Sequence, residues 1–197
     1  MSFEIVMSDQ SKIANFFSKF FGPPITLPAM LVFLFWQTKA FEVGGNFVYL
    51  GILLVLCWLL PVLFFAFSLK KGWIDDIDAT KKEQRYATYS LGGLGWLLGL
   101  WVSRLMVNSQ FWRYYLGVLI LILVLVLVTF FWKISVHAAT VVFFYLLINY
   151  FYHWSFFWLL PVPVLVMWSR WYQKNHTTWQ LVGGTMAAVI IFGVLAL

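Results

Sequence analysis

The sequence predicts an all-α polytopic membrane protein, with six to seven transmembrane helices in a bundle and an N-terminal interfacial amphipathic helix. Of its 197 residues, 63% are hydrophobic and only 10% are charged, and the mean hydropathy is +0.89. A soluble domain carries about 25% charged residues, so this composition excludes the water-soluble classes. Aromatic residues form 21% of the chain, which is typical of proteins whose rings lie at the two bilayer interfaces.

Residues 1–24 predict an amphipathic segment that lies in the membrane interface. Its apolar residues recur at helical spacing, namely Ile13, Phe16, Phe17, Phe20 and Phe21. Lysines, serines and an asparagine occupy the other face, and Gly22, Pro23 and Pro24 end the pattern. A short helix with one apolar and one basic face is typical of a segment that lies on the bilayer rather than crossing it.

Residues 25–197 predict a single transmembrane domain. Its apolar runs are 25–41, 47–69, 87–107, 114–132, 137–152, 155–169 and 177–197. A span requires ~20 apolar residues, with ~17 tolerated, and the runs 47–69 and 114–132 are long enough. The shorter runs 137–152 and 155–169 predict a tight helical hairpin. All are expected to be helices, because lipid offers no partner to unpaired backbone groups.

The distribution of Lys and Arg predicts which face is cytoplasmic. With seven spans, the face that carries the N-terminus holds ten cations, namely Lys12, Lys19, Lys70, Lys71, Lys81, Lys82, Arg85, Lys133, Arg170 and Lys174. The opposite face holds Lys39, Arg104 and Arg113. Cytoplasmic connections carry the excess of Lys and Arg, so we expect a multi-pass protein of the cell membrane whose N-terminal face is cytoplasmic.

Ionisable residues gather in three places, and ionisable residues near membrane depth indicate functional sites. The three clusters are residues 73–86, residues 133–137 and residues 169–180. Two apolar runs separate the first cluster from the second, and two more separate the second from the third. Because an even number of spans returns the chain to the same face, the three clusters are expected to converge at one membrane surface.

The clusters supply cations and neutral donors suited to a phosphate group. The candidate phosphate-binding cations are Lys81, Lys82, Arg85 and Arg170. Arginine offers a planar fork of donors that matches phosphate oxygens. Ser135 precedes an expected helix, whose first N–H groups and dipole favour an anion. Asp78 is expected to orient one of the cations, because a carboxylate beside the phosphate would repel it.

Two of the three histidines lie in these clusters. One histidine can attack phosphorus and a second can protonate the leaving oxygen, and His176 and His137 are the candidates. Gln180 lies four residues after His176, so its amide oxygen can accept Nδ1–H and leave Nε2 free to attack. His153, in the predicted hairpin turn, is given no site role. Lys133 is expected to be a cationic helix end.

These residues carry a resemblance to a known family. Ser-x-His at residues 135–137 and Ser-Arg-x5-His at residues 169–176 resemble the type 2 phosphatidic acid phosphatase superfamily, membrane lipid phosphatases with the motifs Lys-x6-Arg-Pro, Pro-Ser-Gly-His and Ser-Arg-x5-His-x3-Asp. The acidic stretch that leads into Arg85 resembles small prokaryotic members. The resemblance covers roughly residues 60–185 and implies a helical bundle with a six-helix core and a reaction that needs no metal or other cofactor.

Carried over position by position, the resemblance implies roles for individual residues. His176 would be the nucleophile that forms a phosphohistidine, and His137 would be the general acid. The phosphate would be bound by Arg170, Ser135, Arg85 and one lysine, Lys81 or Lys82.

The chain also departs from the family motifs. Gln180 stands for the family's Asp, Ile134 for the Pro and Val136 for the Gly of the second motif, and Asp78 and Tyr86 for the Lys and Pro of the first. Val136 places a β-branched side chain where a glycine lets a backbone N–H approach phosphate.

We therefore expect an integral membrane phosphatase that hydrolyses a lipid phosphate or prenyl (di)phosphate. The net charge of +6 is assigned to topology and anionic lipid, with no nucleic-acid partner. Val136 and Gln180 leave a second hypothesis, an inactive phosphatase-fold protein that binds a lipid phosphate. A third is a magnesium-dependent prenyl or alcohol phosphotransferase. Asp75 and Asp78 begin the required aspartate pattern, but no Asp follows Asp78 and no Glu follows Glu83.

Overall fold

The computed structural model describes residues 9–42, 46–79, 81–106 and 108–197. Within these ranges the α-helices are α1 (Asp9–Phe20), α2 (Pro23–Gln37), α3 (Asn46–Leu54), α4 (Leu60–Lys70), α5 (Tyr86–Leu105), α6 (Ser109–Phe131), α7 (Val136–Phe151), α8 (Pro161–Tyr172) and α9 (Thr178–Ala196). A π-helical turn, Val55–Leu59, joins α3 to α4 without a break. Short 3-10 helices lie at Ala40–Glu42, Lys82–Arg85 and Phe157–Leu159. The ranges described contain no strand, so the prediction of an all-α fold is confirmed.

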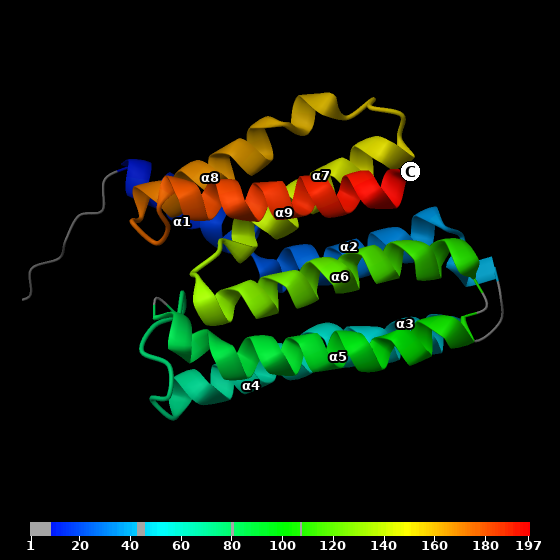
Figure 1. Cartoon of the computed structure of the whole chain (residues 1–197), viewed down its shortest axis with the longest axis horizontal. Helices are drawn as coiled ribbons and strands as arrows, with labels where there is room; N and C mark the ends of the chain where they lie inside the picture. Colours follow the sequence, from blue (N-terminus) through cyan, green and yellow to red (C-terminus); the bar gives the residue numbers. More distant parts are fainter. Residues whose placement is uncertain (1–8, 43–45, 80, 107) are drawn as a thin grey trace, which may run out of the picture.

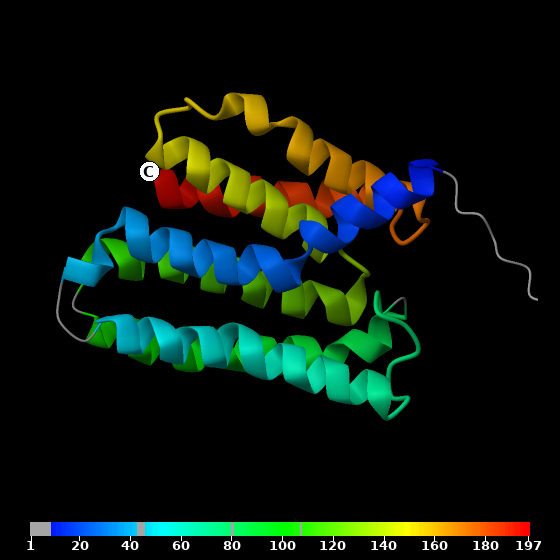
Figure 2. The same ribbon diagram turned by 180° about the vertical axis from the view of Figure 1, so that it is seen from behind.

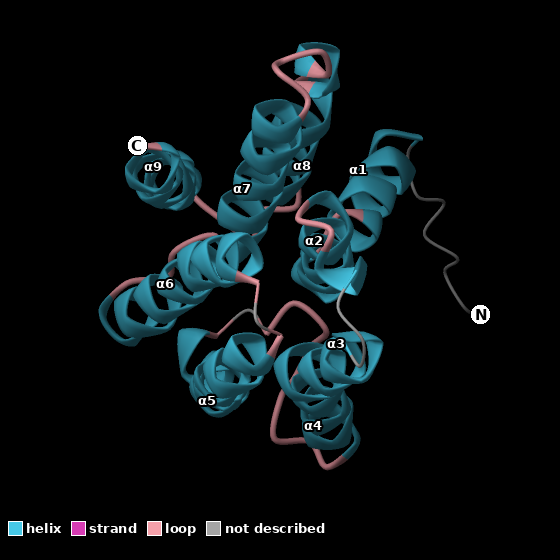
Figure 3. Cartoon of the chain, turned by 90° about the vertical axis from the view of Figure 1, so that its right-hand side faces the viewer, coloured by secondary structure: helices cyan, strands magenta, loops and turns pink. Residues whose placement is uncertain are grey.

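The longer helices run side by side along the long axis of the molecule (Figure 1). Helix α7 lies between α9 and α2, and α5 packs against both α6 and the continuous run of α3 and α4 (Figures 2 and 3). Helix α1 packs against α8. The core between these helices is apolar and includes the fully buried Met30, Leu34 and Phe143.

Three helical runs within the described ranges are long and apolar enough to cross a membrane. They are Asn46–Lys70, Ser109–Phe131 and Thr178–Ala196, and a fourth is present if α1 and α2, which bend by 42° at their junction, count as one span. The prediction of a membrane protein with several apolar helices is therefore supported in this coarser form. Helix α7, with 16 residues, is apolar but shorter than these spans.

Two helices begin away from the first residue of their apolar run. Helix α6 begins at Ser109, five residues before the predicted run at 114, because the Asn108 side chain caps it by accepting a hydrogen bond of 2.8 Å from the backbone N–H of Phe111. Helix α8 begins at Pro161 and not at residue 155. A proline fits the first helical turn, while the residues before it form a turn in which His153 and Trp154 have positive φ.

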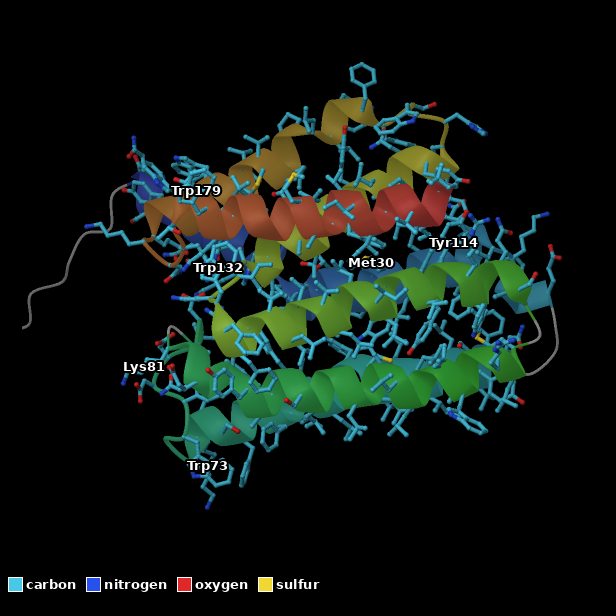
Figure 4. All side chains as sticks on the ribbon, viewed as in Figure 1. Met30, Trp73, Lys81, Tyr114, Trp132 and Trp179 are labelled. Carbon is cyan, nitrogen blue, oxygen red and sulfur yellow. The ribbon has the colours of Figure 1, made fainter. Side chains whose placement is uncertain are left out.

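Exposed aromatic side chains lie at both ends of the bundle, with Trp36 and Trp154 at the end away from α1. Figure 4 places Trp73, Trp132 and Trp179 at the end where the chain passes from α4 to α5, from α6 to α7 and from α8 to α9. Helix α1 lies at the same end (Figure 1). Tryptophan is enriched where a membrane protein meets the headgroup region, so this arrangement indicates that the end lies near one bilayer surface.

Candidate active site

The three polar clusters meet at this end of the bundle, as the count of spans predicted. Arg170 Nη1 in α8 donates a 2.6 Å hydrogen bond to Asp78 Oδ1, which lies between α4 and α5. The backbone N–H of Ser135, between α6 and α7, donates to the carbonyl oxygen of Gln180 in α9 at 3.1 Å. Residues that are about 90 positions apart in the chain therefore form one site.

Arg170 is the central cation of this site, although only 1% of it is exposed. Besides Asp78, its Nη1 donates to Ser18 Oγ of α1 at 2.7 Å. Its Nε is buried and has no hydrogen-bond partner among the described atoms. A buried donor without a partner is rare in proteins, and on a guanidinium it marks a candidate anion-binding residue.

Asp78 holds a cation in place. One carboxylate oxygen accepts from Arg170, and the other accepts from Asn175 Nδ2 at 3.2 Å. The ion pair joins the segment after α4 to the end of α8. Asp78 therefore orients Arg170. The sequence alone did not indicate whether its partner is Arg170 or Arg85.

Arg85 is buried and is held by the segment that precedes it. Its Nε donates to the carbonyl oxygen of Ala79 at 2.7 Å, and its Nη2 donates to that of Asp78 at 3.1 Å. Ala79 has a positive φ of 43°, so this turn is tightly bent. Arg85 both organises the turn and brings a positive charge to the two histidines.

Two of the lysines near the site have described side chains. Lys81 is exposed and forms an ion pair of 2.8 Å with Asp75, which raises the pKa of Lys81. The side chain of Lys82 lies outside the described part of the chain. Lys133, expected to be only a helix end, is half-buried and close enough to Arg85 and Arg170 that burial and their charges lower its pKa.

The hydrogen bonds of His176 fix its tautomer. Gln180 Oε1 accepts from the backbone N–H of Thr177 at 3.1 Å and lies 3.2 Å from His176 Nδ1. Because the Thr177 N–H is a donor, the atom that it meets is the amide oxygen, and that oxygen must receive a proton from Nδ1 as well. In neutral His176 the free lone pair is therefore on Nε2, as the spacing of His176 and Gln180 predicted.

Gln180 also determines where helix α9 begins. It forms a capping box with Thr177, whose hydroxyl accepts from the backbone N–H of Gln180. The cap starts α9 directly after His176 and holds the histidine at the helix N-terminus. Gln180 thus positions the predicted nucleophile.

His137 lies in the first turn of α7 and faces α1. Ser135 caps this helix, with its Oγ accepting from the backbone N–H of Ala138 at 3.3 Å. A Cβ added to Gly22 would lie 3.0 Å from His137 Nε2 and 2.9 Å from the carbonyl oxygen of Ser18. Only glycine fits between the end of α1 and this ring.

The structure adds site residues that the sequence did not indicate. Ser18 and Asn175 both contact the Arg170–Asp78 pair, and Gln173 Nε2 donates to Asn15 Oδ1 of α1 at 2.9 Å. Helix α1 was expected to be an interfacial segment only, yet it forms one wall of the site. No local spacing could reveal these contacts, because two of them join α1 to residues about 150 positions later and the third joins residues 97 positions apart.

Burial keeps His176 neutral. Loss of hydration, followed by the positive charges of Arg85, Arg170 and Lys133, lowers the pKa of His176 to about 3. The uncharged form, which is the nucleophilic one, is therefore present throughout the physiological range.

This pKa leads to a testable pH dependence. Because protonation of His176 removes the nucleophile, the acid limb that it contributes to kcat/KM is expected near pH 3. In Gln180→Glu a carboxylate would face Nδ1–H and raise the pKa of His176 by ~1–3 units, moving that limb to roughly pH 4–6. Profiles of both proteins on one substrate test this expectation. Identical acid limbs would show that His176 does not govern the reaction.

Comparison of the chain with known protein families, curated proteins and solved structures found no match. Within the described ranges, no group of three His, Cys, Asp or Glu side chains is arranged to hold a metal ion. The chemical interpretation of the site therefore depends on its own geometry.

Proposed function

We propose that this protein is an integral membrane phosphatase of the type 2 phosphatidic acid phosphatase superfamily. It hydrolyses a lipid phosphate or prenyl (di)phosphate through a phosphohistidine intermediate. The observation that carries the proposal is His176, buried beside three cations, with Nδ1–H held by Gln180 and its lone pair on Nε2.

The first step transfers the phosphoryl group to the protein. His176 Nε2 attacks phosphorus, the bond from phosphorus to the leaving oxygen breaks, and that oxygen takes a proton from His137. Burial beside Arg170 and Arg85 disfavours the charged His137 ring in the empty site, so His137 takes up this proton together with the negatively charged phosphate. Arg170 and Arg85 stabilise the charge that spreads over the phosphoryl oxygens. The unpaired Nε of Arg170 and the N–H groups at the start of α7 supply donors for these oxygens.

The second step releases phosphate. A water molecule attacks phosphorus and gives a proton to His137, and the P–N bond breaks so that its electron pair returns to His176. His137 is thereby protonated again and loses this proton when the phosphate leaves. Gln180 holds the His176 ring in the same orientation in both steps, because Nδ1 keeps its proton.

The engagement of the aspartates supports this proposal over a magnesium-dependent phosphotransferase. Asp75 pairs with Lys81, and Asp78 pairs with Arg170 and Asn175. Carboxylates that are already bonded to cations are poor ligands for a second cation.

The proposal includes six to seven spans, in which α2, α5, α7, and α8 together with the residues before it, cross the membrane beside Asn46–Lys70, Ser109–Phe131 and Thr178–Ala196. Helix α1 lies in the interface with Ile13, Phe16 and Phe20 exposed toward lipid. The face that carries the site is cytoplasmic, in line with the excess of Lys and Arg there. A substrate whose phosphate reaches this face can keep its tail in the bilayer.

The experiment that tests the function is phosphate release by the purified protein in detergent with EDTA present. We expect release from at least one member of a panel that runs from phosphatidate to farnesyl diphosphate, and a phosphoenzyme that is stable to base and labile to acid. Release that requires added Mg²⁺ would favour the phosphotransferase. A folded sample that binds a lipid phosphate but releases nothing would favour the inactive protein.

A further inference from the structure

A cavity of about 420 Å³ extends from the candidate active site into the apolar part of the bundle. At its polar end it is lined by His137, Asp78 and Gln173, and at its inner end by Cys57 and Trp96. Along α5 the lining residues run from Thr88 to Trp96, a rise of ~12 Å at 1.5 Å per residue. The cavity therefore connects His137 and Asp78, at the edge of the candidate site, with the level of the lipid chains.

The inner end of the cavity suits an apolar occupant. The Tyr115 hydroxyl donates to the carbonyl oxygen of Trp96 at 2.7 Å and lies 3.4 Å from Cys57 Sγ. The Tyr115 hydroxyl, the Cys57 thiol and the Trp96 carbonyl at this inner end are thus already paired with one another. The walls are formed by side chains such as Pro61, Phe65 and Ile122. An occupant of this region is stabilised by burial of apolar surface.

The outer end of the cavity, by contrast, has a polar group that is free to bind a ligand. Thr88 Oγ1 is buried there and has no hydrogen-bond partner among the described atoms. Thr88 lines the same cavity as His137, so its hydroxyl can donate to an oxygen that links a chain to a phosphate. An amphiphile with a phosphate, a linking oxygen and an apolar chain matches the order of groups along the cavity.

We propose that the cavity is the binding site for the single apolar chain of the substrate, and that its size selects single-chain phosphates over diacyl lipids. This inference rests on the proposed function for the position of the phosphate. At ~30 Å³ per water-sized atom, 420 Å³ holds about 14 non-hydrogen atoms. A farnesyl chain is close to this limit, whereas two long acyl chains exceed it more than twofold.

Gly92 determines the free length of the cavity. It lines the cavity on α5, and a Cβ placed on it would meet only Pro61 Cγ, at 4.0 Å. A leucine there is compatible with the helix and extends into the cavity. It adds four non-hydrogen atoms, or ~120 Å³, and leaves space for a chain shorter by about one isoprene unit.

The test compares geranyl, farnesyl and geranylgeranyl diphosphate with dioleoyl phosphatidate in wild-type protein and in Gly92→Leu. The wild type is expected to prefer farnesyl diphosphate. In Gly92→Leu the ratio of kcat/KM for farnesyl to that for geranyl diphosphate should fall at least tenfold. Gly51→Leu is the matched control, because Gly51 is exposed on α3 with no atom within 4 Å of an added Cβ and does not line the cavity. An unchanged ratio in an active, folded Gly92→Leu, or a preference for dioleoyl phosphatidate, would overturn the proposal.

A binding measurement separates this inference from the proposed function. A tetradecyl phosphate with a diazirine near its chain end is photolysed on the protein, and the modified peptides are identified by mass spectrometry. We expect adducts at Cys57 or Trp96 that excess farnesyl diphosphate suppresses, even if the protein releases no phosphate. Adducts confined to lipid-facing residues such as Trp101 and Phe131 would show that the chain stays outside the cavity.

Discussion

Replacement of His176 by alanine is expected to reduce phosphate release by at least ~10³-fold with every substrate, because it removes the nucleophile of the proposed mechanism. Release of phosphate from lipid and from p-nitrophenyl phosphate measures the loss. The phosphoenzyme should also disappear. His176 is buried, so thermal unfolding of the variant must be measured to show that the fold is kept.

The His137→Ala variant distinguishes the two histidines. A general acid contributes ~10²–10⁴-fold when the leaving oxygen is a poor leaving group, so lipid hydrolysis should fall by that factor. With p-nitrophenyl phosphate, whose leaving group needs no proton, the loss should be below about tenfold, and the phosphoenzyme should still form. Equal losses on both substrates would contradict the assigned roles.

His153→Asn is the matched control for both histidine variants. His153 is exposed in the turn between α7 and α8, at the opposite end of α7 from His137, and has a φ of 49°. Asparagine tolerates this left-handed conformation, so the fold should be unaffected. Unchanged activity in this variant would show that the activity lost in the His176 and His137 variants is due to their position in the candidate site and not to the loss of any histidine. Full activity in His176→Ala would instead support another nucleophile.

Much of the site could be predicted because its parts are encoded locally. The four-residue spacing from His176 to Gln180 predicts their contact, since one helical turn begins there, and the structure gives 3.2 Å between Nδ1 and Oε1. The count of apolar runs predicts that the three clusters share one end. Both predictions depend only on helix geometry and on the direction in which each span runs.

The remainder depends on contacts between distant elements. Ser18 reaches Arg170 only because α1 packs across α8, and the local sequence of α1 indicates a surface helix. Lys133 resembles an ordinary helix end until Arg85 and Arg170 are brought beside it. Asp78 could orient either arginine by sequence, and the tertiary structure pairs its carboxylate with Arg170.

The glycines of α5 are a further example of contacts that the local sequence does not predict. Gly92, Gly93 and Gly95 all predict close approach of another helix, because small residues let backbones come together. In the structure a Cβ on Gly95 would lie 2.2 Å from the backbone oxygen of Leu56, within the π-helical turn. Gly92 instead borders the cavity. Identical residues three positions apart therefore have opposite roles, which the pattern alone cannot distinguish.

This difference leads to a large expected effect on stability. Gly95→Ala should destabilise the protein by ~3 kcal/mol, because the added methyl group meets a backbone atom that moves only if two helices separate. Gly92→Ala should be neutral or stabilising by up to ~1 kcal/mol, since alanine favours the helix and the methyl group finds open space. Unfolding of the two variants by SDS titration in detergent micelles measures both values.

The informative result is whether Gly95→Ala is less stable than Gly92→Ala. Helix propensity alone makes both substitutions favourable, so only the contact between Gly95 and Leu56 can make one of them unfavourable. Cys57 follows Leu56 in the π-helical turn and lines the cavity. Gly95→Ala should therefore weaken farnesyl diphosphate hydrolysis more than p-nitrophenyl phosphate hydrolysis. Equal stability of the two alanine variants would mean that α3, α4 and α5 do not pack at the distance described.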